Sequence, residues 1–215
     1  MSDGGTDGAR PLVAVLDYGI GNLRSAEKAL EHVGADAFLT ADPDRVERAD
    51  AVVLPGVGAF GRCREALSES GLDQVALDAV ASGRPFLGIC VGMQLLYEES
   101  DESPGVTGLG VLSGRVQRLP AGVKHPQMQW NQVDLVSESP LFDGLGERPW
   151  MYFVHSFAPE VTGDVIGTCD YGGAVTAAVQ HEMVFATQFH PEKSGTAGLA
   201  LLRNFVRLAA TATVS

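Results

Sequence analysis

The stretch Pro85-Phe86-Leu87-Gly88-Ile89-Cys90-Val91-Gly92-Met93-Gln94 decides the fold of this chain. Its apolar first half is typical of a buried strand, and the run that continues to Glu99 is typical of a helix. One cysteine stands between them with a glycine two residues away on each side, which is the spacing of a nucleophile elbow. The glycines allow a sharp backbone turn, and the N-terminal amides of the helix favour a thiolate. Cys90 is therefore either a nucleophile or a small buried core residue.

Before this elbow, strand and helix patterns alternate along the chain. Three short apolar runs predict strands at residues 12–16, 35–40 and 51–54, and three periodic runs predict helices at residues 23–33, 60–68 and 72–81. Such alternation predicts an α/β fold with a mostly parallel central sheet and helices on both faces. Ligands of such sheets bind at the carboxyl ends of the strands, where Asp17-Tyr18, Pro55-Gly56 and Cys90 all fall.

The second half of the chain has a different texture. Short alternating patterns with turns between them predict strands at residues 115–119, 132–136, 151–155, 174–179 and 183–189. These strands favour an antiparallel β extension of the parallel sheet. A closing helix follows at residues 194–208, with Ser194 or Thr196 as its N-cap. Because no linker or repeat is visible, we expect one domain over residues 11–211 after a disordered tail at residues 1–10.

Composition limits the classes of function. The 215 residues are 45% hydrophobic and 20% charged, so a sizeable core can form. The net charge of −12 argues against nucleic acid and against an anionic membrane surface as partners. Three dispersed cysteines, Cys63, Cys90 and Cys169, indicate neither a disulfide framework nor a zinc site, and we expect no metal and no cofactor. No secretory signal follows Met1 and no apolar run reaches ~18 residues, so the expected location is cytoplasmic.

A cysteine nucleophile needs a base, and the base needs a group that orients it. Among the five histidines, His190 follows an apolar strand and precedes Pro191-Glu192. Side chains at i and i+2 of a strand point to the same side, so His190 and Glu192 can lie side by side. The alternative is a surface histidine beside a solvated glutamate. The other histidines fit turns, a helix end or a strand end, at His32, His125, His155 and His181.

Glycine-rich turns offer a competing function. Gly56-Val57-Gly58-Ala59-Phe60-Gly61 formally matches the G-x-G-x-x-G pattern of dinucleotide sites. However, no acidic residue ends a following strand at the required distance, and after Gly19-Ile20-Gly21 the third glycine is replaced by Arg24. We therefore favour a second use, in which backbone N–H groups of the turn at residues 56–58 bind a developing oxyanion.

Three motifs, each at a strand end, resemble those of a known family. Pro55-Gly56-Val57-Gly58, the Cys90 elbow and Phe189-His190-Pro191-Glu192-Lys193-Ser194 together resemble the class I, triad-type glutamine amidotransferases. Within that class the chain is similar to the glutaminase subunits of imidazole glycerol phosphate synthase. The segments that carry this narrower resemblance are Asp17-Tyr18-Gly19-Ile20-Gly21-Asn22-Leu23-Arg24-Ser25, Trp130-Asn131 and Tyr152-Phe153-Val154-His155-Ser156. The resemblance covers residues 12–208 and implies a flavodoxin-like sheet.

The resemblance also implies a role for each site residue. Cys90 would attack the side-chain carboxamide of glutamine, His190 would transfer the protons, and Glu192 would orient His190. The oxyanion would be bound by Gly56, Val57, Gly58 and Val91. Glutamine would be held by Gln94, Glu102, Ser156 and Phe157. Glu102 stands in an acidic run whose alternative role is a solvated surface.

A partner is implied as well, because ammonia that leaks into water becomes ammonium. In the family a (β/α)8 cyclase subunit receives the ammonia and makes imidazole glycerol phosphate and AICAR in histidine biosynthesis. The expected interface residues of this heterodimer, whose alternative role is ordinary packing, are Tyr18, Asn22, Trp130, Asn131 and Tyr152. The family usually has Pro-His-Met-Gly-Trp-Asn where this chain has Pro126-Gln127-Met128-Gln129-Trp130-Asn131, and often Tyr in place of Phe157. These departures put the coupling to the partner in question.

Three other functions fit parts of the pattern. A glutaminase that serves anthranilate or aminodeoxychorismate synthase is disfavoured by the segment at residues 17–25. A non-catalytic binding module on the same scaffold is disfavoured because Cys90, His190 and Glu192 are all present. A free-standing thiol hydrolase or peptidase would be fully active without a partner, and an assay distinguishes it on that ground.

Overall fold

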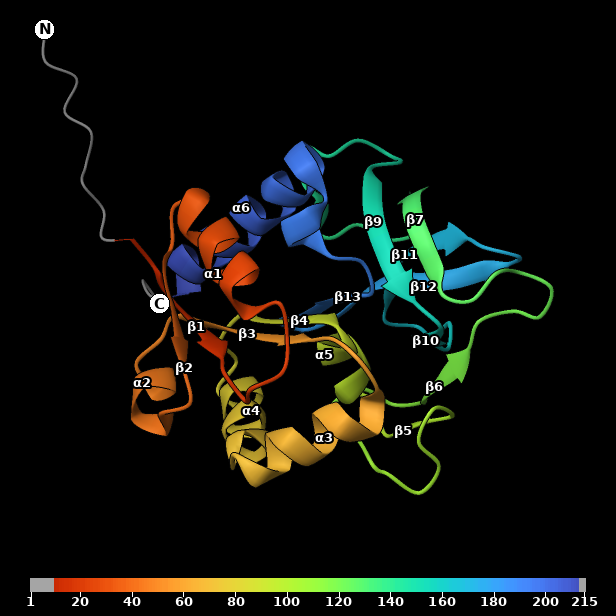
Figure 1. Cartoon of the computed structure of the whole chain (residues 1–215). Coiled ribbons are helices and arrows are strands. Elements are labelled where there is room, and N and C mark those ends of the chain that lie inside the picture. The colour runs from red at the N-terminus through yellow and green to blue at the C-terminus, as the bar shows by residue number, and fades with distance from the viewer. Residues whose placement is uncertain (1–9, 213–215) are drawn as a thin grey trace, which may run out of the picture.

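The computed structural model describes residues 10–212 of the chain. The tail expected at residues 1–10 therefore lies almost wholly outside the described residues. Within the described part, an eight-stranded sheet is covered by helices, and two small sheets lie at one end of it (Figure 1). None of the helices in this part has both the length and the apolar character needed to cross a membrane.

The main sheet joins a parallel half to an antiparallel half. Its strand order is β2-β1-β3-β4-β13-β12-β11-β8, with parallel pairing from β2 to β13 and antiparallel pairing from β13 to β8. In this order the strands span Asp36–Thr40, Leu12–Leu16, Ala51–Gly56, Phe86–Cys90, Val184–Thr187, Ala174–His181, Val165–Asp170 and Asp134–Leu135. Strands β3, β4 and β13 are buried along their whole length, which explains their unbroken apolar sequences. The predicted parallel sheet with an antiparallel extension is confirmed.

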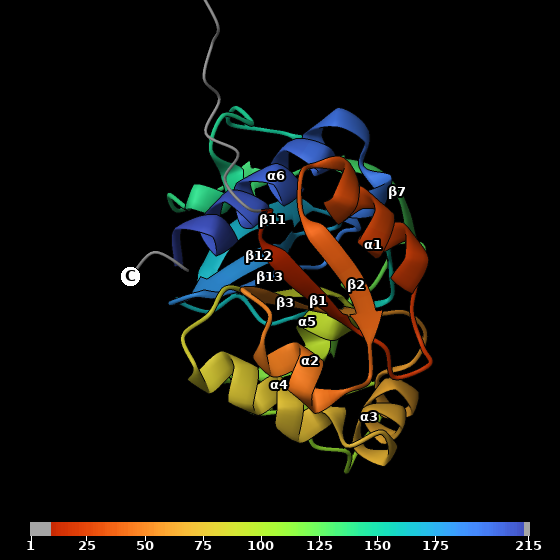
Figure 2. The ribbon, with the colours of Figure 1, turned by 90° about the vertical axis from the view of Figure 1, so that its left-hand side faces the viewer.

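Helices cover both faces of the main sheet (Figures 1 and 2). One face carries α1 (Leu23–His32) and α6 (Gly195–Ala212). The other face carries α2 (Pro43–Glu47), α3 (Phe60–Glu69), α4 (Leu72–Ala81) and α5 (Val91–Leu95). Two short 3₁₀ helices, η1 (Pro140–Phe142) and η2 (Pro191–Lys193), complete the helical elements of the described residues.

Two small sheets lie beside the antiparallel half (Figure 1). One contains β10 (Phe157–Pro159), β6 (Arg115–Arg118) and β5 (Glu99–Ser100). The other pairs β7 (Gln127–Gln132) with β9 (Trp150–His155) in antiparallel register. Because β9 and β10 follow each other directly, residues 154–157 join the two small sheets.

The two glycines of the elbow serve close packing rather than the turn itself. Neither Gly88 nor Gly92 has a positive φ, and the residue with a φ of 56° is Cys90. A Cβ on Gly92 would lie 1.8 Å from the carbonyl oxygen of Leu54 in β3, and one on Gly88 would lie 3.0 Å from the backbone of Met93. The expected role of the glycines is thus corrected: they let α5 pack closely against β3 and β4, and Cys90 itself takes the unusual conformation.

Other local differences have simple causes. The sequence did not predict helix α2, because a helix of about one turn is too short to show a helical period. The side chain of Asp42 caps it. The strand expected at residues 132–136 is present only as the last residue of β7 and the two-residue strand β8, while β7 itself was not predicted because its polar sequence hides the alternation. Ser194 takes the expected N-cap position of α6, since its carbonyl accepts from the Gly198 N–H group, but its hydroxyl does not cap the helix: it donates to the His190 carbonyl and accepts from the Tyr152 N–H group.

Candidate active site

Three adjacent strand ends bring the predicted site residues to one edge of the main sheet. Gly56 at the end of β3 is in register with Cys90 at the end of β4, and Thr187 at the end of β13 is in register with Ile89. The chain leaves β13 and reaches His190 just before η2. The parallel order β3-β4-β13 therefore places the glycine turn, the cysteine and the histidine side by side.

Cys90 has a strained backbone conformation at the start of α5. Its φ and ψ are 56° and −111°, and such a conformation costs a non-glycine residue roughly 1–3 kcal/mol. The residue is 3% exposed. Its Sγ lies 3.9 Å from the Val154 carbonyl oxygen and 3.7 Å from Nε2 of Gln188. Strain at a buried thiol at the end of a strand favours a nucleophile over a core residue, because an ordinary core position needs no strained turn.

His190 and Glu192 form a buried pair next to this cysteine. Nδ1 of His190 lies 2.9 Å from Oε1 of Glu192, and the two side chains are 1% and 2% exposed. The pairing comes from the turn into η2 and not from the strand alternation that the sequence suggested. Nδ2 of Asn22 donates to the same carboxylate oxygen at 3.4 Å, while Oε2 of Glu192 is buried without a partner among the described residues.

The His190 ring holds a proton at neutral pH. Burial lowers its pKa, but interactions with Cys90 and Glu192 outweigh the burial and raise the pKa to about 9. Because the carboxylate only accepts, Nδ1 carries a hydrogen and Nε2 is the atom left for the thiol. Nε2 is buried and makes no hydrogen bond within the described residues. The geometry therefore suits a thiolate–imidazolium pair, in which the ring can return its proton to a leaving group.

Cys90 and His190 line a cavity of about 70 Å³. This volume holds a few water molecules and is far below the ~300 Å³ of a small ligand pocket. The other residues assigned to the oxyanion and to glutamine that line the cavity are Val57, Gly58, Val91, Gln94, Glu102, Ser156 and Phe157. Gly56 does not line it, because it packs against Tyr18 and Gly92 beneath the turn.

Glu102 joins the cavity to the start of α3. Its Oε2 accepts a hydrogen bond from the Phe60 N–H group at 2.7 Å, and the neighbouring Ser103 hydroxyl accepts one from Gly61 at 3.0 Å. Ala59 at the N-cap position has no side chain that could do this. The negative charge of Glu102 also suits the positive end of the helix. The solvated alternative for Glu102 is therefore wrong, since the carboxyl group is anchored at the cavity.

Two buried donors hold the glycine turn from inside. The Tyr18 hydroxyl donates to the Pro55 carbonyl at 2.6 Å, and the Cys63 thiol donates to the Val57 carbonyl at 3.3 Å. Burial raises the pKa of both groups, that of Cys63 to about 11, so both keep their protons at neutral pH. Tyr18 is 5% exposed, so its side chain lies under the turn and not on the surface where an interface residue would stand.

His155 is buried at the end of β9 and also lines the cavity. Its Nδ1 lies 2.9 Å from the Phe157 carbonyl oxygen, and its Nε2 lies 2.9 Å from Oε1 of Gln127. Burial lowers the pKa of His155 to about 4, so the ring is neutral at pH 7. Because the Phe157 carbonyl only accepts, the hydrogen of the neutral ring is on Nδ1 and Nε2 is an acceptor, so the Gln127 amide must be reversed from this assignment to bring its NH₂ group to Nε2. Gln127, a departure from the family pattern, thus supports the cavity wall.

Sequence reasoning missed Gln188, which contacts Cys90. Gln188 is fully buried, its Oε1 accepts from Nε2 of Gln94 at 3.0 Å, and its Nε2 faces Cys90. The available signal was a polar residue inside the apolar run at residues 183–189, where an amide needs buried partners.

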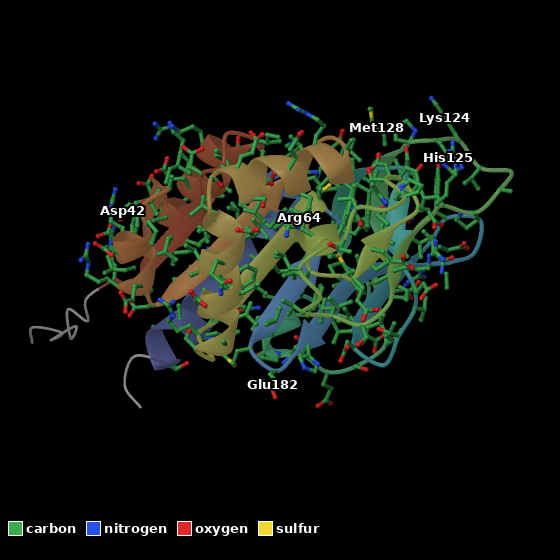
Figure 3. The ribbon with its side chains drawn as sticks, turned by 90° about the horizontal axis from the view of Figure 1, so that it is seen from below. Asp42, Arg64, Lys124, His125, Met128 and Glu182 are labelled. Atoms are coloured by element: carbon green, nitrogen blue, oxygen red, sulfur yellow. The ribbon has the colours of Figure 1, made fainter. Side chains whose placement is uncertain are left out.

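Strands β7 and β9 present large side chains on the surface. Trp130 is 48% exposed, and its ring meets that of Tyr152 edge to face with 6.0 Å between the centroids. Met128 is 63% exposed and projects away from the body of the molecule (Figure 3). Nδ2 of Asn131 donates to the Asp170 carbonyl at 3.0 Å, which ties β7 to β11.

The backbone of Tyr152 connects this surface to the buried pair. Its carbonyl accepts a hydrogen bond from the His190 N–H group, and its own N–H group donates to the Ser194 hydroxyl, both at 3.0 Å. A displacement of β9 is therefore transmitted directly to the turn that carries His190. Within residues 10–212, no group of three or more His, Cys, Asp or Glu side chains is placed to hold a metal ion.

The fold and the site together are those of a class I glutamine amidotransferase, and the family model "Glutamine amidotransferase class-I" matches residues 14–209. A solved structure described as a glutamine amidotransferase superimposes with a TM-score of 0.73 at 25% identity, covering 92% of this chain and 98% of that one. The structure of PurLQS from Thermotoga maritima gives a TM-score of 0.74 at 21% identity, with the same coverage, and shows the fold alone.

Curated relatives are more specific. Imidazole glycerol phosphate synthase subunit HisH of Methanothermobacter thermautotrophicus is 52% identical over 198 residues, covering 92% of this chain and 98% of the relative. The subunit of the same name from Syntrophotalea carbinolica is 47% identical, covering 90% and 98%. The chain therefore belongs to the class I glutamine amidotransferase family and, within it, to the HisH subunits of imidazole glycerol phosphate synthase.

Proposed function

We propose that this chain hydrolyses glutamine to glutamate and ammonia with Cys90, His190 and Glu192, and passes the ammonia to a (β/α)8 cyclase subunit in a heterodimer. The observation that carries the proposal is the buried His190–Glu192 pair beside a strained thiol. The names of the relatives supply the synthase and, with it, histidine biosynthesis. Residues 11–211 form the single domain that does this work.

The first half of the reaction forms a thioester. The Cys90 thiolate attacks the side-chain carbonyl carbon of glutamine, and the carbonyl oxygen becomes an oxyanion. Val57, Gly58 and Val91 line the cavity, and we assign the stabilisation of that charge to their backbone N–H groups. The C–N bond then breaks, His190 gives its proton to the leaving nitrogen, and ammonia departs.

The second half releases glutamate. A water molecule attacks the thioester carbon, and His190, now neutral, takes a proton from the water. The C–S bond breaks, glutamate leaves, and the thiolate–imidazolium pair is restored. Glu192 keeps the ring in one orientation through both halves, because its carboxylate holds the Nδ1 hydrogen throughout.

Gln94, Glu102, Ser156 and Phe157 hold the amino-acid end of glutamine. Gln94 uses both hydrogens of its amide within the protein, which leaves its oxygen for a donor on the substrate. Glu102 uses Oε2 to cap α3, so its second oxygen and its charge are available to the α-ammonium group. Ser156 and Phe157 line the same cavity, and the Phe157 carbonyl accepts a hydrogen bond from Gln94.

Glutamine does not fit the cavity in its closed form, so binding requires movement of the wall. β9 carries the exposed Trp130–Tyr152 contact on one side and the hydrogen bond to His190 on the other. A cyclase that docks on Trp130, Asn131, Asn22 and the neighbouring edge would move β9, widen the cavity and receive the ammonia. Low activity of the isolated chain and activation by the partner follow from this arrangement.

The test is the release of glutamate from glutamine, measured for the chain alone and with the cyclase and its ligand. Wild type is compared with Cys90→Ala and with Cys169→Ala, which alters a buried cysteine outside the cavity. We expect activation by the cyclase, loss of at least ~10³-fold in Cys90→Ala, and retention of most activity in Cys169→Ala. Glutamate release that survives Cys90→Ala would refute the mechanism. Full activity without a partner would contradict the subunit role and favour a free-standing hydrolase.

A further inference from the structure

Two buried amides form a hydrogen-bond chain from the backbone of the cavity wall to the nucleophile. Nε2 of Gln94 lies 2.9 Å from the Phe157 carbonyl oxygen and 3.0 Å from Oε1 of Gln188. Nε2 of Gln188 in turn lies 3.7 Å from Sγ of Cys90. Gln94 is 3% exposed and Gln188 is fully buried, so neither amide can exchange these partners for bulk water.

Only one orientation of the two amides satisfies this chain. A carbonyl oxygen only accepts, so Gln94 must present its NH₂ group to Phe157. The second hydrogen of the same NH₂ group then points to Gln188, which must accept it through its side-chain oxygen. Gln188 therefore turns its own NH₂ group to Cys90. Reversing Gln188 would bring its NH₂ group against that of Gln94, and reversing both would bring an amide oxygen against the Phe157 oxygen.

From this order we infer that Gln188 is a fixed hydrogen-bond donor to the sulfur of Cys90, locked by Gln94 and Phe157, and that it stabilises the thiolate over the thiol. The inference rests on the proposed function, in which Cys90 is the nucleophile. A donor to a charged acceptor favours the charged form. Because the Gln188 orientation depends on a backbone group of the cavity wall, the donor is in place before glutamine binds.

The contacts of the sulfur change in a definite way during the reaction. In the thiol state the S–H group has the Val154 carbonyl as its acceptor at 3.9 Å, and Gln188 donates to a sulfur lone pair. When the proton moves to His190, the sulfur becomes an acceptor only and the Val154 contact loses its hydrogen. Gln188 remains as a neutral donor. In the thioester the sulfur is a weak acceptor, so the Gln188 contact favours release of the thiolate again.

Other titratable groups around the sulfur do not replace this donor. Those that face Cys90 from the cavity and from below are His190 with Glu192, Glu102, His155, Tyr18 and Cys63. His155 is neutral, Tyr18 and Cys63 keep their protons, and the carboxyl groups oppose a thiolate. His190 is the one cation among these described groups, and its proton is consumed when ammonia leaves. The sulfur is then part of the thioester, and Gln188 is the donor beside it that does not titrate and is still in place when the thiolate is released.

The experiment measures the thiolate directly. Alkylation of Cys90 by iodoacetamide is followed across pH by mass spectrometry of its peptide, for the full chain in complex with its cyclase. Gln188→Met keeps the length of the side chain and removes the donor, and Gln188→Glu places an acceptor oxygen there. We expect the pH midpoint of alkylation to rise by about one unit and the rate near pH 7 to fall about tenfold in Gln188→Met, and more in Gln188→Glu.

The matched control is Thr187→Val, which removes a buried hydrogen bond to the Phe189 carbonyl one residue away and does not touch Cys90. A midpoint in Gln188→Met equal to that of Thr187→Val would overturn the inference, even if kcat for glutamine fell. If Gln188→Met fails to fold, Gln188→Glu decides by the same midpoint. A shifted midpoint in Gln188→Met, found together with a wild-type complex that releases no glutamate, would leave the role of Gln188 standing and remove the proposed function. An unshifted midpoint in Gln188→Met, found together with a wild-type complex that releases glutamate, would overturn the role of Gln188 and leave the proposed function standing.

Discussion

Nδ1 of His190 and Oε1 of Glu192 lie 2.9 Å apart in a turn that excludes almost all solvent. The base and the group that orients it are therefore carried by one short segment, while the thiol comes from a strand much earlier in the chain. Because the ring donates through Nδ1, the carboxylate both selects the tautomer and stabilises the cation. In the proposed mechanism this turn therefore acts as one preassembled proton-transfer unit.

Glu192→Gln tests this unit. An amide keeps the shape of the carboxylate but removes its charge, so the His190 cation loses a partner that raises its pKa. We expect glutaminase kcat of the activated complex to fall ~10²-fold or more, with KM changed little. NMR titration of the His190 ring should show its pKa lowered from about 9. Glu65→Gln, on an exposed face of α3, is the control and should match wild type. A normal kcat in Glu192→Gln would contradict the role of the pair.

Two substitutions separate the two tasks of Glu102. Glu102→Gln keeps an oxygen that can accept from the Phe60 N–H group, whereas Glu102→Ala loses both the cap and the charge. We expect both to raise KM for glutamine at least ~10-fold, because both lose the charge that faces the α-ammonium group. Only Glu102→Ala should lower the free energy of unfolding, by ~1 kcal/mol. Steady-state kinetics and urea unfolding measure the two effects. Equal KM values for Glu102→Gln and wild type would remove Glu102 from the glutamine site.

Gly92→Ala tests the packing of the elbow. The added Cβ would meet the Leu54 carbonyl oxygen at 1.8 Å, so either α5 or β3 must shift. We expect a loss of ~3 kcal/mol or more in the free energy of unfolding and a loss of glutaminase activity. Gly163→Ala is the control, because a Cβ there meets no atom within 4 Å and φ is not positive. Urea unfolding of both variants measures this difference. Each should unfold in one cooperative transition, as expected for one domain over residues 11–211. If Gly92→Ala lowered the free energy of unfolding by much less than this, α5 and β3 could move apart at low cost, and the close packing would not be required.

The two buried histidines predict opposite effects of pH on stability. His155 has a pKa of about 4 in the fold against 6.5 in the open chain, so between those values the unfolded chain binds more protons and stability falls as the pH falls. His190 has a pKa of about 9, so the folded chain binds more protons between 6.5 and 9 and stability falls as the pH rises. Urea unfolding from pH 4.5 to 9 should therefore peak near neutrality. His155→Gln should flatten the acid side alone; an unchanged acid slope would show that carboxyl groups dominate it.

The fold was predictable because the strands of its parallel half are continuous apolar runs and its helices show a clear helical period in the sequence. The runs at residues 12–16 and 51–54 need both faces covered, and only a sheet between two layers of helices provides that. The site was predictable to the extent that chemistry marks its residues: a cysteine between glycines, and a histidine before a proline and a glutamate. Strand β7 was not predicted, because its pattern is the inverse of the usual one. The apolar side chains of Met128 and Trp130 are exposed, and the buried face begins with a glutamine.

What the sequence could not reveal were the contacts made at long range. Nothing around Gln188 marks it as the neighbour of Cys90, because a buried glutamine and a surface glutamine look alike in one sequence. Tyr18 was expected at the partner interface from the family resemblance, yet its hydroxyl donates to the Pro55 carbonyl inside the molecule. Hydrogen-bond partners that lie in separate strands are fixed by tertiary packing, and a local pattern carries no record of them.

Strand β13 occupies the seam between the two halves of the sheet, with β4 on one side and β12 on the other. During synthesis on the ribosome, the segment with β1 to β4 emerges first and already contains the thiol. The edge of β4 has no strand to pair with until Val184–Thr187 has been made. The turn that carries His190 and Glu192 follows β13 in the chain. A chain synthesised only as far as β12 therefore contains the thiol but lacks His190 and Glu192. In the proposed mechanism such a chain has neither the base nor the group that orients it.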